Sequence, residues 1–327
     1  MRRYLLSKVL GALLTLVFVI CFNFFLFRVV PGDPAALLLR GTSAFNPENV
    51  DELRAQLGLD KPLPLQFVVY VKDTAELNFG DSFYGRGAPV TELIGERMWR
   101  TLLLVGTSTI ASAIIGLIIG IYGGWRRGST FDVTSLGFTL FVYAMPEFWF
   151  GILVLMAFAG GVGPFPALFP TGGYESPASD LTGFAHIVDV LNHLALPWLV
   201  LTIAYLGEYA IIMRSALIDI LGDDYIQTAR AKGVREKHVL WRHAVPNALL
   251  PTMTLTLLSL GFVFSGAITI EYVFSYDGLG SLTVAAIDGN DYPVLQGLFL
   301  LFSAAVIVSN LVADILYSYL DPRVRAG

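Results

Sequence analysis

Charged residues and cysteine are scarce in this sequence. Asp, Glu, Lys and Arg make up only 14% of its 327 residues, whereas hydrophobic residues make up 55%. Soluble globular domains carry about 25% charged residues, so the composition excludes an ordinary soluble domain and predicts a membrane protein. The single cysteine, Cys21, lies within an apolar run and has no second cysteine to pair with, which excludes an internal disulfide framework.

Patterns for nucleotide hydrolysis and metal catalysis are also missing. No lysine lies in the phosphate-binding pattern G-x-x-x-x-G-K-[ST], so any ATP hydrolysis must take place on another polypeptide. The four histidines, His186, His193, His238 and His243, have no metal-binding spacing, and neither G-x-S-x-G nor H-E-x-x-H occurs. We therefore predict a non-enzymatic chain with no catalytic, cofactor-binding or metal-binding residue and no nucleic-acid partner.

Long apolar runs are the main feature that the sequence does contain. A bilayer core of roughly 30 Å needs about 20 apolar residues in a helix. The first run is longer than the ~7–15 apolar residues of a signal peptide, so we interpret it as a retained span. The predicted fold is an all-α integral membrane protein with six transmembrane helices, at about 9–30, 101–123, 133–158, 194–218, 249–272 and 294–318.

Basic residues are distributed unevenly between the two sets of loops. Positive charge favours the cytoplasmic side of a membrane, and with the N-terminus inside, the cytoplasmic segments hold 13 of the 21 lysines and arginines. Both termini are therefore predicted to be cytoplasmic. The 13 residues are Arg2, Arg3, Lys8, Arg126, Arg127, Arg214, Arg230, Lys232, Arg235, Lys237, Arg242, Arg323 and Arg325.

The predicted spans divide the chain into three parts. Residues 1–30 form the cytoplasmic N-terminus and the first span, and residues 31–100 form a small external insertion. Residues 101–327 form a five-span core, which contains a cytoplasmic loop at 219–248.

The external segments contain further local signals. Asn46-Pro47-Glu48 is typical of a helix start, and Gly58 is typical of its end. A second external helix is predicted at about 65–77. The loop at about 159–193 is rich in Gly and Pro and is predicted to be irregular.

Small residues recur every four positions in the second span, at Ser112, Gly116, Gly120 and Gly124. This spacing places them along one helical face, where a second helix backbone can approach closely. We interpret the face as a helix-packing surface in preference to a pore lining.

Two carboxylates lie inside predicted spans. An ionised carboxylate at mid-bilayer costs at least about 2.5 kcal/mol, so Glu147 and Glu208 should face protein or water. One hypothesis is that one or both face a polar cavity, where they could meet a cationic group. The alternative is a structural pair with a basic or hydroxyl group elsewhere in an assembly. Asp314, near the end of the last span, is expected to be structural. Pro146 is expected to kink the third span.

The loop between the fourth and fifth spans is polar and basic. The run from Asp223 to Ala231 has acids near its start and bases near its end, which suits a helix dipole. Gly233 then permits a sharp turn, and Pro246 lies where the next span begins. The pattern predicts a helix, a turn and a second helix at the cytoplasmic face. Contact of these bases with anionic lipid is one interpretation.

This loop resembles the EAA loop of permeases from binding-protein-dependent ABC importers. Gly233, Ala229 and the ending Val245-Pro246 fit that motif, whereas Gln227, Thr228 and His243 depart from its general form. The stretch DYIQTARAKG is similar to the version in the dipeptide, oligopeptide and nickel permease family. Further segments resemble the B-type subunit of that family in the same order along the chain, at 27–34, 80–82, 89–90, 278–280, 291–293, 314–317 and 320–323.

The resemblance implies the type I ABC importer permease fold and a coupling helix that docks in a cleft of an ATPase. It implies these partners: a second homologous permease, two cytoplasmic ATPase subunits that bind ATP and Mg²⁺, and an external solute-binding protein. The location implied is a prokaryotic plasma (inner) membrane. The residues implied to couple to an ATPase are Asp224, Tyr225, Thr228, Ala229, Arg230, Ala231, Lys232 and Gly233.

The function implied is uptake of dipeptides or oligopeptides delivered by the external binding protein. For such a function, Glu147 and Glu208 are candidates for the translocation path, where they could meet a peptide amine. Members of the family also import oligosaccharides, glutathione or nickel complexes, so these remain alternatives. A membrane scaffold that only recruits a cytoplasmic protein is a more distant alternative, because it does not need six spans with carboxylates inside them.

Overall fold

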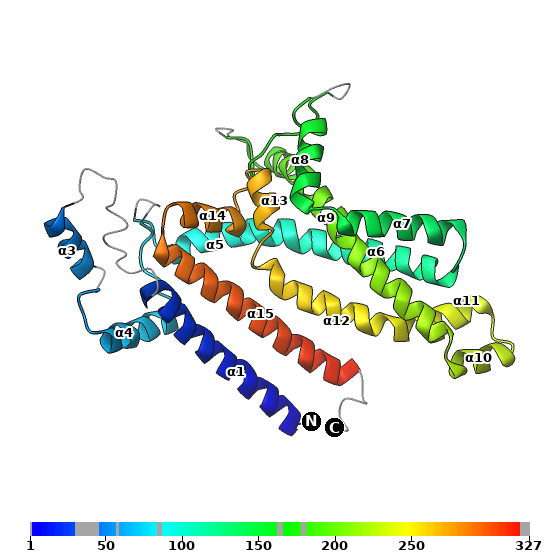
Figure 1. The fold of residues 1–327 in the computed structure, drawn as a ribbon. Helices are drawn as coiled ribbons and strands as arrows, with labels where there is room; N and C mark the ends of the chain where they lie inside the picture. The colour runs from blue at the N-terminus through cyan, green and yellow to red at the C-terminus, as the bar shows by residue number, and fades with distance from the viewer. Residues whose placement is uncertain are drawn as a thin grey trace.

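The computed structural model describes residues 2–29, 46–56, 59–83, 87–161, 166–177 and 181–320. Within these ranges the regular secondary structure is helical, and the only extended pairing is an isolated bridge between Asp81 and Pro89. Long helices lie side by side in a bundle, and short helices lie at both of its ends (Figure 1).

The helices follow one another along the chain as α1 (Arg2–Phe24), η1 (Phe25–Val29), α3 (Pro47–Gln56), α4 (Leu63–Ala75), α5 (Val90–Thr101), η2 (Leu102–Gly106), α6 (Thr107–Trp125), α7 (Thr130–Ala144), α8 (Glu147–Phe158), α9 (Phe184–Leu221), α10 (Asp224–Ala231), α11 (Glu236–His238), η3 (Val239–Ala244), α12 (Val245–Val263), α13 (Ile268–Val273), α14 (Leu279–Asp288) and α15 (Tyr292–Leu320). The three η segments are single π-helical turns that continue a neighbouring α-helix.

The prediction of six spans is confirmed if one bent pair counts as a single span. Among the described residues, five helices are long and apolar enough to cross a membrane, and α7 and α8 together make up the sixth. Several spans are longer than predicted, because polar ends extend the apolar helices. The second runs without interruption from Val90 to Trp125, and the fourth from Phe184 to Leu221.

The first and last spans are neighbours although they come from opposite ends of the sequence. α1 lies beside α15 (Figure 1). Near the start of α1, Lys8 Nζ donates to Asp314 Oδ1 on α15 at 3.0 Å. Asp314 therefore takes part in a contact between helices, as expected for a structural carboxylate.

The third span is broken, not merely kinked. α7 ends at Ala144, α8 begins at Glu147, and the two helices meet at 99°. Met145 and Pro146 between them are extended, with ψ of 130° and 123°. A residue that precedes proline is excluded from the helical region, so Pro146 ends α7 instead of bending it.

The predicted fifth span, 249–272, was wrong at both ends. Its helix starts earlier, because α11, η3 and α12 run together from Glu236, and it stops at Val263. Gly266, with φ of +73°, turns the chain before the short helix α13. A left-handed residue cannot continue an α-helix, and the apolar residues on both sides hide this break from a hydropathy pattern.

The short helix α13 carries a fully buried carboxylate. Glu271 Oε2 accepts from the backbone N–H groups of Gly280 and Ser281 at 2.7 and 3.1 Å, and Oε1 accepts from Thr101 Oγ1 at 3.0 Å. These N–H groups belong to the first turn of α14, where a helix favours negative charge. The hydrogen bonds of Glu271 thus hold α13 against the start of α14 and the end of α5.

The two helices predicted between the first and second spans are confirmed at Pro47–Gln56 and Leu63–Ala75. The expected stop at Gly58 lies outside the described residues. The loop at 159–193 was predicted to be irregular throughout, and this was wrong for its last part, because α9 begins at Phe184. Residues 184–193 are mainly apolar and contain no Gly or Pro, so they continue the helix of the span that follows.

Candidate functional site

The polar loop folds as the predicted helix, turn and second helix at one end of the bundle. α10 ends at Ala231, and Gly233 has φ of +75°, which L-residues with a side chain rarely adopt. The backbone N–H groups of Gly233 and Val234 donate to Arg230 and Ala229 and close the turn. The start of α1 and the end of α15 lie at the same end of the bundle as α10 (Figure 1).

One face of α10 is fixed to the rest of the bundle. Ile226 is fully buried and Ala229 is nearly so. Both belong to an apolar cluster that includes Met213 and Leu217 of α9 and Val239 of η3. Protein cores are close-packed and hardly compressible. We therefore expect a displacement of α10 to displace α9 and η3 as well.

The other face of α10 points outward. Ala229 is buried and Arg230 is partly buried, so the structure divides the eight residues that were implied to couple to an ATPase. The six that are exposed are Asp224, Tyr225, Thr228, Ala231, Lys232 and Gly233.

A shallow cavity of about 350 Å³ lies between α10 and η3, with Tyr225 and Thr228 on one side, His243 on the other and Ala229 among its lining. Partial burial, and then the nearby carboxylate of Asp223, raise the pKa of the Tyr225 hydroxyl above its usual value. The hydroxyl donates to the backbone carbonyl of His243 at 3.4 Å. The cavity has room for side chains of another protein.

The side chain of Arg230 contacts two other residues of this chain. Its Nε and Nη2 donate to Glu236 Oε1 and Oε2 at 3.1 and 3.3 Å, and its guanidinium lies 5.9 Å from the ring centre of Trp125. Trp125 is the last residue of α6. Arg230 thus connects α10 directly to the end of α6.

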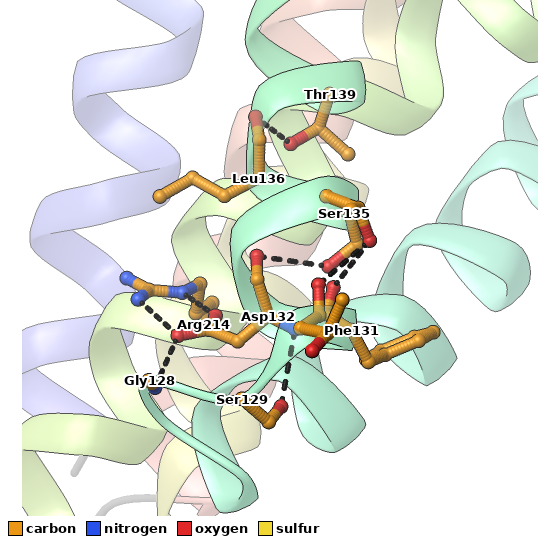
Figure 2. Close-up of polar contacts among 10 residues, drawn as sticks. Gly128, Ser129, Phe131, Asp132, Ser135, Leu136, Thr139 and Arg214 are labelled. Atoms are coloured by element: carbon orange, nitrogen blue, oxygen red, sulfur yellow. Dashed lines mark hydrogen bonds and ion pairs between the residues drawn. The ribbon is translucent and has the colours of Figure 1, made fainter.

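A buried ion pair lies close to the turn between α6 and α7. Arg214 Nε and Nη2 donate to Asp132 Oδ1 and Oδ2 at 2.6 and 2.9 Å, and Asp132 Oδ2 also accepts from Gly128 N (Figure 2). Ser129 Oγ accepts from Asp132 N and caps α7. The sequence Ser129-x-x-Asp132 before an apolar run is a capping-box signal that could have marked this site.

The small residues of the second span lie against α9. Alanine at Gly116 would bring its Cβ to 2.6 Å from Tyr209 Cβ, and alanine at Gly120 would bring it to 2.7 Å from the carbonyl oxygen of Ala210. Ser112 Oγ donates to Thr202 O of α9 at 3.0 Å. At Gly124 the added Cβ would lie 3.1 Å from Arg214 O.

The two carboxylates inside the spans have different surroundings. Glu147, at the first position of α8, accepts from Thr269 Oγ1 of α13 at 2.6 Å. This bond joins the break in the third span to the break after α12. Glu208 instead lines a cavity of about 240 Å³ between α6, α9 and α12, together with Tyr205 and Tyr209. Glu147 is not among the residues that line this cavity.

Comparison with known families identifies the chain. Residues 113–326 match the family described as binding-protein-dependent transport system inner membrane component, and residues 1–104 match its N-terminal companion family. The chain belongs to this permease family. Family membership makes it a non-enzymatic subunit that works with separate ATPase and substrate-binding components in an inner membrane.

Individual relatives extend the match to the full length of this permease. A peptide permease protein of Brucella suis biovar 1 is 38% identical over 99% of both chains. The oligopeptide transport system permease protein AppB of Bacillus subtilis is 34% identical over 99% of this chain and all of its own. The glutathione transport system permease protein GsiC of Salmonella choleraesuis is 37% identical over 99% of both chains.

Three sites in this permease were not found by sequence reasoning. The ion pair of Asp132 with Arg214 joins residues 82 positions apart, and Glu271 with Thr101 joins residues 170 apart. Only the capping box near Asp132 left a local signal. The third site is the bond of Arg230 with Glu236. Both residues lie in the polar loop, but their contact depends on the turn at Gly233.

Proposed function

We propose that this permease is a membrane-spanning subunit of an importer that takes up dipeptides or oligopeptides. An external solute-binding protein delivers them, and ATP hydrolysis on partner subunits drives their passage. The observation that carries the proposal is the full-length similarity, at 34% and 38% identity, to permeases of peptides and oligopeptides.

The proposed orientation places both termini and α10 in the cytoplasm. It is supported by two independent observations. The start of α1, the end of α15 and α10 lie at the same end of the bundle (Figure 1), and the predicted cytoplasmic segments hold most of the basic residues.

The proposed partners are a second homologous permease, two cytoplasmic ATPases that bind ATP and Mg²⁺, and the external binding protein. In this proposal the exposed face of α10 docks in a cleft of one ATPase, with the cavity beside Tyr225 and Lys232 as part of the contact. The buried face, through Ile226, transmits the motion of the ATPase to α9. Such rigid-body motion can alternate access to the two sides of the membrane.

The two carboxylates receive different proposed roles. Glu208 lines a cavity, and its proposed role is to face the translocation path. Glu147 is bonded to Thr269 and serves to hold two broken spans together.

Reconstitution tests the proposed function. The complex is purified from its host through a tag on this permease, placed in liposomes with ATP inside, and supplied outside with its binding protein and a radiolabelled dipeptide or tripeptide. Uptake that needs both ATP and the binding protein supports the proposal. A second candidate function is glutathione import, which the similarity to GsiC supports. Uptake of glutathione in place of other peptides favours this second function. Uptake of only an oligosaccharide or a nickel complex contradicts a peptide importer.

A further inference from the structure

The cavity beside Glu208 is a polar site within an apolar part of the bundle. Glu208, Tyr205 and Tyr209 come from successive turns of α9, at a spacing that places residues on neighbouring parts of a helix surface. Ser259 of α12 and Thr109 of α6 complete the polar side of the lining. Three helices thus converge on a single carboxylate.

A buried hydroxyl also belongs to this lining. Tyr209 is only 2% exposed, and its hydroxyl lies close to the hydroxyl groups of Ser259 and Thr256. A hydroxyl can both donate and accept, so Tyr209 can bond to one of these neighbours and still offer a hydrogen bond to a ligand.

The charge of the cavity is not balanced by its own lining. Among the described residues that line it, Glu208 is the one carboxylate and none is Lys, Arg or His. The last residues of α12, Phe262 and Val263, also border it, and the C-terminal end of a helix carries partial negative charge. Both features favour a cation.

The size of the cavity limits what can enter. Its volume of about 240 Å³ is below the roughly 300–1,000 Å³ of pockets that enclose a drug-sized ligand. It can hold one end of an elongated solute but not a whole oligopeptide.

We propose that this cavity binds the protonated amino group of the transported solute during its passage, with Glu208 as the counter-charge and Tyr209 as a hydrogen-bond partner. The inference rests on the proposed function as a peptide importer, and it names the group of the peptide that the permease itself contacts. An ammonium group donates up to three hydrogen bonds, so it can satisfy the carboxylate and a neighbouring hydroxyl at once.

Glu147 provides a matched comparison. It is a second carboxylate within the same set of spans, but Thr269 already donates to it, and it does not line the cavity. Replacing either glutamate by glutamine removes one negative charge at nearly constant volume. Only the change at Glu208 should affect contact with the solute.

The experiment measures peptides transported per ATP hydrolysed in proteoliposomes, with saturating peptide-loaded binding protein. Glu208→Gln should lower this ratio roughly ten-fold or more, because one partner of a buried charge pair is lost. Glu208→Asp should restore part of it, and Tyr209→Phe should lower it several-fold without loss of assembly. Glu147→Gln should leave the ratio unchanged. Assembly of every variant is checked by recovery of the partner subunits.

A second measurement identifies the cation. Millimolar propylammonium should inhibit uptake by the wild-type complex but not the residual uptake by the Glu208→Gln variant. Propanol, a neutral molecule of similar size, should inhibit neither. A wild-type ratio in Glu208→Gln overturns the proposal. So does inhibition that follows sodium or pH instead of the amine, because the site then binds an inorganic cation or a proton. If the wild-type complex moves no peptide, the proposed function has failed instead.

Discussion

Arg214 of α9 and Asp132 of α7 form a two-point ion pair at 2.6 and 2.9 Å (Figure 2). The side chain of Asp132 is only 3% exposed and that of Arg214 is 22% exposed. The pair lies where α7 begins, next to the turn that follows α6, and it fixes the third span to the fourth at the end of the bundle that carries α10.

Replacement of Asp132 by asparagine should destabilise the permease. The change weakens two charge-assisted hydrogen bonds to a guanidinium that is still partly exposed, so we expect a loss of about 1–3 kcal/mol. Thermal unfolding in detergent measures the effect. Removing both charges, in Asp132→Asn with Arg214→Gln, should cost less than the sum of the two single changes. As a control, Glu76→Gln breaks the exposed pair with Lys72 and should cost under about 1 kcal/mol.

Replacement of Gly120 by alanine should separate α6 from α9. The added Cβ would lie 2.7 Å from the carbonyl oxygen of Ala210 and 2.8 Å from Met213 Cβ, and overpacking of this kind costs about 1–3 kcal/mol. Gly137→Ala in α7 is the control, because nothing lies within 4 Å of its added Cβ. Unfolding midpoints of the two variants should differ clearly. Equal midpoints contradict the close packing of α6 on α9.

The number and order of the spans could be predicted because each is an apolar run long enough to cross a bilayer. Their breaks were harder to predict. Pro146 marked the break in the third span but not its angle of 99°, and it did not reveal that α8 contacts α13, where Gly151 lies close to Ile270. The break at Gly266 lies among apolar residues and leaves no signal in hydropathy.

The candidate sites also differ in whether residues close together in sequence determine them. The helix, turn and helix at α10 follow from residues close together in sequence, including Gly233. The sequence also marked Glu208 as unusual. Its neighbours Ser259 and Thr109 come from other helices, so the cavity itself depends on tertiary packing that one sequence does not reveal.

Replacement of Gly278 by alanine should disrupt the buried site of Glu271. The added Cβ would lie 2.5 Å from both Glu271 Oε2 and Thr101 Oγ1, so the carboxylate must move and lose bonds to the start of α14. We expect a loss of about 1–3 kcal/mol, measured by thermal unfolding. Gly95→Ala in α5, with open space around its Cβ, is the control. Stability equal to that control is the result that would contradict this role of Glu271.

Replacement of Arg230 by alanine should weaken coupling while the ATPases remain bound. Its ion pair with Glu236 and its contact with Trp125 each contribute about 0.5–1 kcal/mol, and both keep α10 aligned with α6. We expect several-fold fewer peptides transported per ATP. Lys237→Ala removes the same charge from an exposed position of the loop and serves as control. If both variants lower the ratio equally, the net charge of the loop matters and the contacts of Arg230 do not.

The turn at Gly233 gives a graded series of variants. Its φ of +75° is costly for residues with a side chain, by about 1–2 kcal/mol, but nothing lies within 4 Å of an added Cβ. Backbone strain, and not a clash, should therefore set the order. Gly233→Asn should be mildest, because asparagine tolerates the left-handed region, Gly233→Ala should be intermediate, and Gly233→Val should be worst.

The measurement for this series is the amount of ATPase that copurifies with the permease, followed by uptake per ATP. A distorted turn moves α10 relative to α11 and should reduce both quantities in the order given. Gly128→Asn offers a control, because Gly128 also has positive φ and open space but lies in the turn between α6 and α7. A valine variant of Gly233 that retains full ATPase binding and full uptake would show that the shape of this turn is not needed for coupling.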